Sequence, residues 1–161
     1  MDAVTLGSNP PAEAWPESLV GAHERLCRDL ERVATLVLGS RAEAEDVVQD
    51  VFVSASTRWS EVEHPDAYLR AAVVNRCRSV LRRRATAERL RPDPPPPDAP
   101  EQLVELRDVL LALPLRQRTV IALRYIEGLD DHTIAGVLDC RPATVRSLRA
   151  RGLRQIRKEL T

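Results

Sequence analysis

A run of prolines near the middle of the chain constrains its fold more than any other feature of the sequence. Six prolines fall between residues 91 and 100. Proline has no backbone N–H and a fixed φ, so such a run excludes a helix and predicts a stiff, extended spacer. A chain of 161 residues can hold one ordinary domain or two small ones. The proline run favours two small domains with a linker at residues 91–101.

Helical periodicity precedes this linker, after a leader that lacks it. Residues 1–17 contain Pro and Gly without apolar periodicity, which predicts a flexible leader. From residue 19 to 38, apolar side chains recur at three- and four-residue steps and predict an amphipathic helix. Ser40 and Glu43 have the spacing of a capping box, in which each satisfies a free backbone donor, so a second helix should start here.

A third helix completes the unit that we expect over residues 18–90. Pro65 suits a first helical position, and the pattern continues to about Leu90 while becoming rich in arginine. After the linker, residues 102–161 contain four shorter helical patterns, separated at Pro114, Gly128 and a turn before Pro142. Aromatic residues make up only 3%, so Leu, Val and Ala must form the cores. The sequence therefore predicts an all-α protein.

The charges of the chain are unevenly distributed, although their sum is zero. Residues 76–91 carry seven arginines against the single acid Glu88, and residues 141–158 carry seven bases and no acid. Stabilising surface helices usually alternate in sign, so an uncompensated basic tract favours an anionic ligand such as nucleic acid. The alternative for each tract is a solvated basic surface that keeps the protein soluble.

The strongest local signal is the pair of short helices expected between residues 129 and 153. Small Ala135 lies at the middle of the first, a tight turn follows, and the second exposes Thr144, Arg146, Ser147 and Arg151. This is helix-turn-helix spacing, in which the second helix enters the major groove of DNA and arginine contacts guanine edges. We therefore predict a DNA-binding unit at the C-terminal end.

Two further side-chain groups lie before the linker. The arginine-rich end of the third helix would contact phosphate, and Trp59 and Tyr68 are near enough in sequence to stack on bases, unless they belong to the core. Asp46, Gln49 and Asp50 form a polar stripe on the second helix, which suits either a docking surface or simple compensation of the helix dipole. The basic group consists of Asn75, Arg76, Arg78, Arg82, Arg83 and Arg84.

These segments resemble conserved regions of the sigma-70 family of RNA polymerase subunits. Regions 1.1 and 3 of the larger members have no counterpart, which points to the extracytoplasmic-function group. The arginine-rich residues 74–79 resemble the variant common among its actinobacterial, sigma-E-like members. The matching segments are residues 44–52 (region 2.2), residues 68–69, 74–75 and 81–84 (regions 2.3 to 2.4), and residues 113–114, 116–118, 123–129 and 144–147 (region 4).

The resemblance implies a sigma factor that binds core polymerase and directs promoter-specific initiation. The polymerase contacts would be the clamp helices of the largest subunit and the flap of the second-largest. Clamp binding would involve Asp46, Gln49, Asp50 and Phe52. Binding of the single-stranded −10 element would involve Trp59, Tyr68, Asn75, Arg76, Arg78, Ser79, Arg82 and Arg83. Binding of the double-stranded −35 element would involve Arg141, Thr144, Arg146, Ser147, Arg149 and Arg151.

The family pattern has an apolar residue where Arg149 stands and a turn glycine where Asp139 stands. The family also makes an anti-sigma factor a candidate partner. We expect no catalytic residues, cofactor or metal, because the three cysteines and three histidines are scattered. We expect a cytoplasmic protein without membrane insertion, since there is neither a long apolar stretch nor a signal pattern.

Two other functions remain open from the sequence alone. One is a stand-alone helix-turn-helix regulator whose N-terminal helices dimerise or sense a signal without binding core polymerase. The other is a helical nuclease, which would need carboxylates that converge on a metal. Glu43, Glu45, Asp46 and Asp50 instead lie on adjacent or outward positions.

Overall fold

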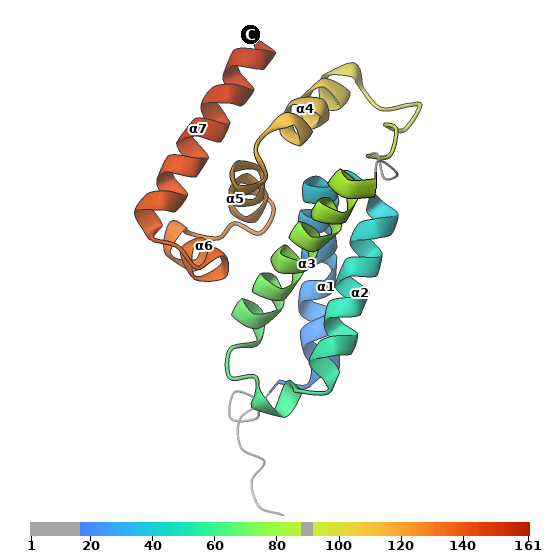
Figure 1. The fold of residues 1–161 in the computed structure, drawn as a ribbon, viewed down its shortest axis with the longest axis vertical. Helices are drawn as coiled ribbons and strands as arrows, with labels where there is room; N and C mark the ends of the chain where they lie inside the picture. The colour runs from blue at the N-terminus through green and yellow to red at the C-terminus, as the bar shows by residue number, and fades with distance from the viewer. Residues whose placement is uncertain (1–16, 88–91) are drawn as a thin grey trace, which may run out of the picture.

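The computed structural model describes residues 17–87 and 92–161, and every regular element among these residues is helical. The predicted leader, the predicted helix end at Leu90 and the start of the linker lie outside the described residues, except for Glu17. Figure 1 shows α1, α2 and α3 running side by side as a bundle, with α4 to α7 beside it. The all-α prediction is confirmed.

Three helices and one short turn form the N-terminal unit. Ser18 begins α1 by accepting a hydrogen bond from the Gly21 backbone N–H, and Gly39 ends it with a φ of 73°. Ser40 accepts from the Glu43 backbone N–H at the start of α2, as predicted. The elements are α1 (Leu19–Leu38), α2 (Arg41–Ser56), the 3-10 turn η2 (Trp59–Glu61) and α3 (Pro65–Ala87).

Four helices form the C-terminal unit. The side chain of Asp130 caps α6 by accepting from the Thr133 backbone N–H, and Pro142 occupies the first turn of α7. Asp139 ends α6 with a φ of 50°, the left-handed geometry that Asp tolerates better than most residues. The elements are α4 (Glu101–Ala112), α5 (Leu115–Tyr125), α6 (Asp131–Leu138) and α7 (Pro142–Leu160).

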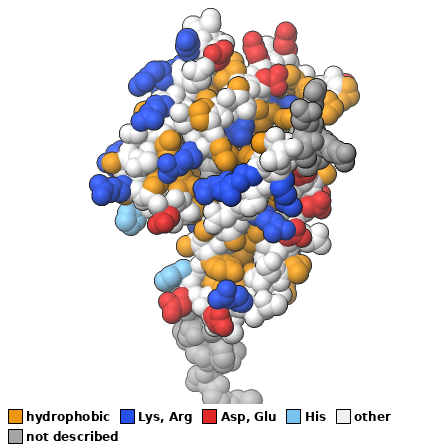
Figure 2. Space-filling model, viewed as in Figure 1, with side chains coloured by type: hydrophobic (Ala, Val, Ile, Leu, Met, Phe, Trp, Pro, Cys, Tyr) orange, Lys and Arg blue, Asp and Glu red, His pale blue; other side chains and the backbone are white. Residues whose placement is uncertain are grey.

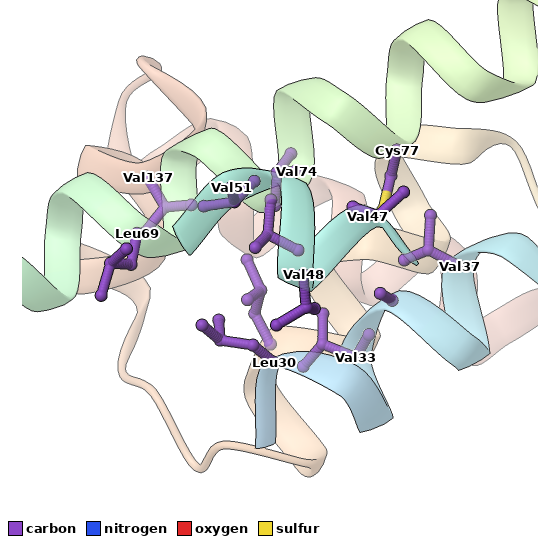
Figure 3. Close-up of a cluster of buried hydrophobic side chains, with 14 of the residues drawn as sticks. Leu30, Val33, Val37, Val47, Val48, Val51, Leu69, Val74, Cys77 and Val137 are labelled. Atoms are coloured by element: carbon purple, nitrogen blue, oxygen red, sulfur yellow. The ribbon is translucent and has the colours of Figure 1, made fainter. Parts of the chain in front are cut away.

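The two units share one cluster of buried apolar side chains. Leu30 of α1, Val48 of α2 and Leu69 of α3 belong to the same cluster as Leu123 of α5 and Val137 of α6. Figure 3 shows Val137 beside side chains of the N-terminal bundle. At about 25 cal/mol per Å² of apolar surface removed from water, this burial holds the units together as well as each unit within itself.

The first described linker residues rest on the turn between α1 and α2. The Asp93 backbone N–H donates to the Gly39 carbonyl oxygen at 2.9 Å, and the Asp93 carboxylate accepts from the Arg41 backbone N–H at 3.2 Å. A Cβ at Gly39 would lie 2.9 Å from Pro92 Cβ and 3.0 Å from a methyl carbon of Leu111. Only glycine fits there, because the position combines a positive φ with this close approach.

Candidate nucleic-acid interface

The C-terminal candidate is the pair α6 and α7, which pack on each other across the turn at Asp139. Val145 and Leu148 lie on the inward side of α7, where they are buried in the core. Gly152 is also buried, and a Cβ there would lie 2.6 Å from a methyl carbon of Ile121 on α5. This close contact fixes which side of α7 faces outward.

The outward side of α7 carries most of the residues predicted to contact the −35 element. Arg146, Ser147 and Arg151 are exposed, and so is Arg141 just before the helix. Arg154 is exposed one turn after Arg151; sequence reasoning missed it, although a spacing of three residues from Arg151 could have revealed it. Figure 2 shows Lys and Arg side chains gathered along the edge of the molecule where α7 lies.

Arg149 differs from the other predicted −35 residues because it has a partner within the protein. Its guanidinium donates to the Asp131 carboxylate in the first turn of α6, and both side chains are largely buried. Thr144 is half-buried. Since buried Leu148 provides the apolar contact expected of this helix, Arg149 acts as a link between α6 and α7, on a different side from Arg151.

The second candidate surface lies on α3. Asn75, Arg76 and Ser79 are exposed and line a hollow of about 260 Å³ together with Tyr68 and Asp50. Arg82 and Arg83 are also exposed in the next turn, whereas Arg78 is half-buried. The hollow therefore brings together hydrogen-bond donors and one aromatic ring, the combination that suits an unpaired base and its phosphate.

Arg84 does not belong to this surface. Its guanidinium donates to the Leu38 carbonyl oxygen at 2.6 Å and pairs with Glu43, with only 9% of its side chain exposed. Burial lowers the pKa of the Arg84 guanidinium, the direction expected for a cation removed from water. The prediction that Arg84 is part of the basic surface is wrong. The reciprocal half of the capping box is absent too, because Glu43 pairs with Arg84 instead.

The two aromatic candidates differ in accessibility. Trp59 packs against the core, and its indole N–H donates to the Glu17 carbonyl oxygen at 2.8 Å. Tyr68 is exposed and lines the hollow on α3. The structure therefore leaves Tyr68 as the ring available for stacking beside Asn75, and it gives Trp59 a structural contact.

The predicted polymerase-binding stripe on α2 lies directly beside the basic surface of α3. Asp46, Gln49 and Asp50 are exposed. Asp50 accepts a hydrogen bond from Arg76 at 3.0 Å. A second hollow, of about 310 Å³, is lined by Asp46, Asp50, Arg76 and Arg83. The acidic and basic surfaces thus adjoin along the groove between α2 and α3.

Phe52 faces inward and is only 6% exposed, with its ring edge-on to His23 at 4.7 Å between ring centroids. An apolar groove of about 350 Å³ lies next to it, lined by Leu19, Val20, His23, Gln49, Phe52, Val53 and Ser56. Val20 and Val53 are 67% and 64% exposed, which is unusual for two apolar side chains that line the same groove. Sequence reasoning missed Val20, because nothing in the sequence shows that α1 and α2 align these two valines.

Family models match both helical units. The Sigma-70 region 2 model matches residues 22–87, and the Sigma-70 region 4 model matches residues 103–156. The chain is similar to the RNA polymerase sigma-E factor of Streptomyces coelicolor, with 32% identity over 81% of this chain and 79% of the relative. The sigma-E factor of Streptomyces avermitilis is 31% identical over 81% of this chain and 78% of the relative.

Two solved structures resemble the fold. One is the sigma factor RpoE from Bartonella quintana in complex with the anti-sigma factor NepR, with a TM-score of 0.70 and 21% identity over 85% of this chain and 94% of that chain. The other is CnrH in complex with the cytosolic domain of CnrY, with a TM-score of 0.69 and 24% identity over 88% of this chain and 86% of that chain. No described helix here is long and apolar enough to cross a membrane.

Proposed function

This chain belongs to the extracytoplasmic-function group of the sigma-70 family, and we propose how its surfaces divide the work of promoter-directed initiation by RNA polymerase. The observation that carries the proposal is the presence of two outward arginine surfaces, one on α3 and one on α7, with an acidic stripe beside the first. Members of this family are regulatory subunits. Nucleotide addition belongs to the polymerase.

The stripe on α2 docks on the clamp helices of the largest polymerase subunit. Asp46, Gln49 and Asp50 supply charged and amide contacts, and the adjoining groove at Val20 and Val53 supplies apolar area. Binding surfaces combine an apolar centre with a polar rim, and this face of α1 and α2 has both. Phe52 is buried and forms the floor of this groove, so only a small part of its ring is available to the partner.

The surface on α3 binds the −10 element as a single strand. Arg76, Arg82 and Arg83 contact phosphates, while Tyr68 and Asn75 hold an unstacked base in the hollow on α3. The surface on α7 binds the −35 element as a duplex, with Arg146 and Arg151 reaching base edges in the major groove. Arg141 and Arg154 extend this surface along the phosphates.

An anti-sigma factor is a candidate regulator. One solved structure that shares this fold is of a sigma factor in complex with the anti-sigma factor NepR, and another was determined in complex with the cytosolic domain of CnrY. We propose that the protein acts in the cytoplasm, where core polymerase and the promoter are found, and that the C-terminal unit contacts the polymerase flap.

Binding to purified core polymerase in the absence of DNA tests the docking assignment. Asp46→Lys is the cleanest variant, because Asp46 takes part in none of the ion pairs of the described residues. We expect it to weaken binding by at least about tenfold. A positive side chain in place of the docking carboxylate would be repelled by the partner, at a cost of about 1.4 kcal/mol or more. Asp98→Lys in the exposed linker applies the same charge change away from both units, so it serves as the control. Equal binding by the wild type and Asp46→Lys would refute the assignment.

The alternative of a stand-alone helix-turn-helix regulator is not favoured, because both units match sigma-70 regions in the expected order. A run-off transcription assay separates the two functions directly. A sigma factor confers start-site selection on core polymerase, whereas a stand-alone regulator binds DNA and leaves core polymerase unable to initiate at the promoter.

A further inference from the structure

We propose that a cavity lined by α1 and α4 binds a nucleoside di- or triphosphate, with the phosphates on Arg28 and Arg107 and the nucleobase against an apolar wall. None of the residues that line this cavity is assigned above to core polymerase or to DNA. The proposal therefore goes beyond the proposed function and does not depend on it.

The cavity is larger than the two hollows beside α3 and the groove next to Phe52. Its volume is about 510 Å³, which lies within the range of roughly 300–1,000 Å³ that small-molecule sites occupy. Residues of α1 form one wall, and Arg107 and Leu111 of α4 form another. The turn between α1 and α2 contributes Gly39 at the end of the cavity. A ligand the size of a nucleotide therefore fits.

Positive charge is concentrated around the cavity. Four arginines line it, against the single acid Glu31. Arg32 and Arg41 pair with half-exposed acids that do not line the cavity. Arg28 is exposed and takes part in none of the ion pairs of the described residues. Stabilising surface pairs alternate in sign, so this excess of one sign favours an anionic ligand.

Arg107 is held in place before any ligand binds. Its Nη2 donates to the Gly39 carbonyl oxygen at 3.1 Å and to the Asp93 carbonyl oxygen, and its side chain is only 26% exposed. Carbonyl oxygens satisfy N–H groups without cancelling the positive charge. The donors on Nε and Nη1 are therefore available to a phosphate, and binding through them costs little side-chain entropy.

The cavity also has an apolar wall, which a bare anion would leave in contact with water. Leu36, Leu111 and Ile126 line it, and each is half-buried. A planar nucleobase removes such side chains from water, whereas inorganic phosphate or triphosphate does not. An apolar wall beside cationic side chains therefore favours a nucleotide over a simple anion.

The end of the cavity at Gly39 favours a small ligand over a nucleic-acid strand. Pro92 and Leu111 approach Gly39 so closely that no side chain fits there. A strand of RNA or DNA needs a basic groove that continues along its backbone. Because the chain fills the space beyond Gly39, the cavity accommodates one nucleotide and not the next.

Isothermal titration calorimetry of the full-length chain with ATP, in the absence of polymerase and DNA, tests the proposal. We expect ATP to bind. Adenosine and inorganic triphosphate should each bind at least about tenfold more weakly, because each supplies only part of the contacts. Since guanidinium groups contact the phosphates directly, binding should persist after magnesium is removed with a chelator.

Substitutions locate the site. Arg28→Ala should weaken ATP binding by at least about tenfold, because it removes a charge-assisted contact to phosphate. Arg28 is exposed, so the fold should be retained, which far-UV circular dichroism verifies. Arg58→Ala, an exposed arginine just before η2, is the matched control and should bind ATP as the wild type does. Arg146→Ala with Arg151→Ala should also leave ATP binding unchanged.

Four results would overturn the proposal. The first is no binding of ATP up to about 1 mM. The second is equal affinity for ATP and inorganic triphosphate, which would indicate a simple anion site. The third is loss of ATP binding in the double variant of α7 and none in Arg28→Ala, which would place the phosphates on the DNA-binding surface. The last is an RNA oligonucleotide that binds more tightly than ATP and loses that binding in Arg28→Ala, which would reassign the cavity to a strand.

Discussion

The helices α3 and α7 are both rich in arginine, but they use that charge differently. On α3, Arg76 pairs with Asp50, Arg70 pairs with Glu127, and Arg84 pairs with Glu43. On α7, the only ion pair among the described residues is that of Arg149 with Asp131, and the outward arginines face solvent. Much of the basic charge of α3 therefore serves the fold, whereas that of α7 is available to a ligand.

This difference matches the two kinds of DNA that the helices are proposed to bind. A duplex presents a regular array of phosphates and base edges, so a free helix face suffices to recognise it. An unpaired strand needs a hollow that holds single bases, and α3 can form one only with acids and apolar residues of α2 beside it. A substitution on the outward face of α7 should therefore affect duplex binding alone. A substitution on α3 should affect both the binding of the unpaired strand and the neighbouring surface of α2.

The largest expected effect comes from removing two outward arginines of α7. Arg146→Ala combined with Arg151→Ala should reduce transcription from a −35-dependent promoter by about 100-fold, since each base contact contributes about 1–3 kcal/mol. Run-off transcription with saturating core polymerase measures this. Arg32→Ala, an exposed arginine of α1, is the control and should retain wild-type transcription. Retained transcription in the double variant would show that α7 does not read the promoter.

A smaller effect, divided between two functions, is expected on α3. Asp50→Ala should weaken binding to core polymerase by about tenfold and at the same time free Arg76, which would strengthen binding to an unpaired −10 strand. The free energy of unfolding should fall by less than about 0.5 kcal/mol, because both side chains of the Asp50–Arg76 pair are about half exposed. Fluorescence anisotropy with core polymerase and with single-stranded DNA measures both affinities. Opposite changes would support a shared surface, and a change in one alone would separate the two.

The sequence was sufficient to predict the helices, because their signals are local. The spacing of apolar residues, the cap at Ser40, and Pro65 at the start of α3 each depend on neighbours within one helical turn. Such features need no knowledge of how the helices pack.

The partners of individual charged residues could not be predicted, because they are distant in sequence. Arg84 looked like the last member of a basic run, but Glu43 and Leu38 meet it across the bundle. Arg149 looked like a DNA-reading residue, but Asp131 lies beside it in the preceding helix. The linker was expected to be a spacer, and nothing in its proline pattern indicates that Asp93 contacts Gly39.

Arg149 provides a sharper test of the side of α7 that faces DNA. Arg149→Ala should lower the free energy of unfolding by about 1 kcal/mol, because it breaks a largely buried pair with Asp131, and it should leave the base preference at the −35 element unchanged. Arg151→Ala should do the opposite, with little change in stability and an altered base preference. Urea denaturation and binding to a library of −35 duplexes measure the two effects. An altered base preference in Arg149→Ala would place Arg149 on the reading face.

The smallest effect concerns an ion pair that joins α1 and the start of α3. Hydrogen bonds from Arg25 hold the pKa of Asp66 below its ordinary value of 3.8. A carboxyl whose pKa is depressed by folding contributes stability above its unfolded pKa and loses it as the pH falls through the folded pKa. Asp66→Asn should therefore cost at most about 0.5 kcal/mol at pH 7, since both partners are about half exposed, and progressively less below pH 4. Urea denaturation at a series of pH values measures this, with Asp98→Asn in the exposed linker as the control. A cost that persists unchanged at low pH would mean that Asp66 contributes through packing and not through its charge.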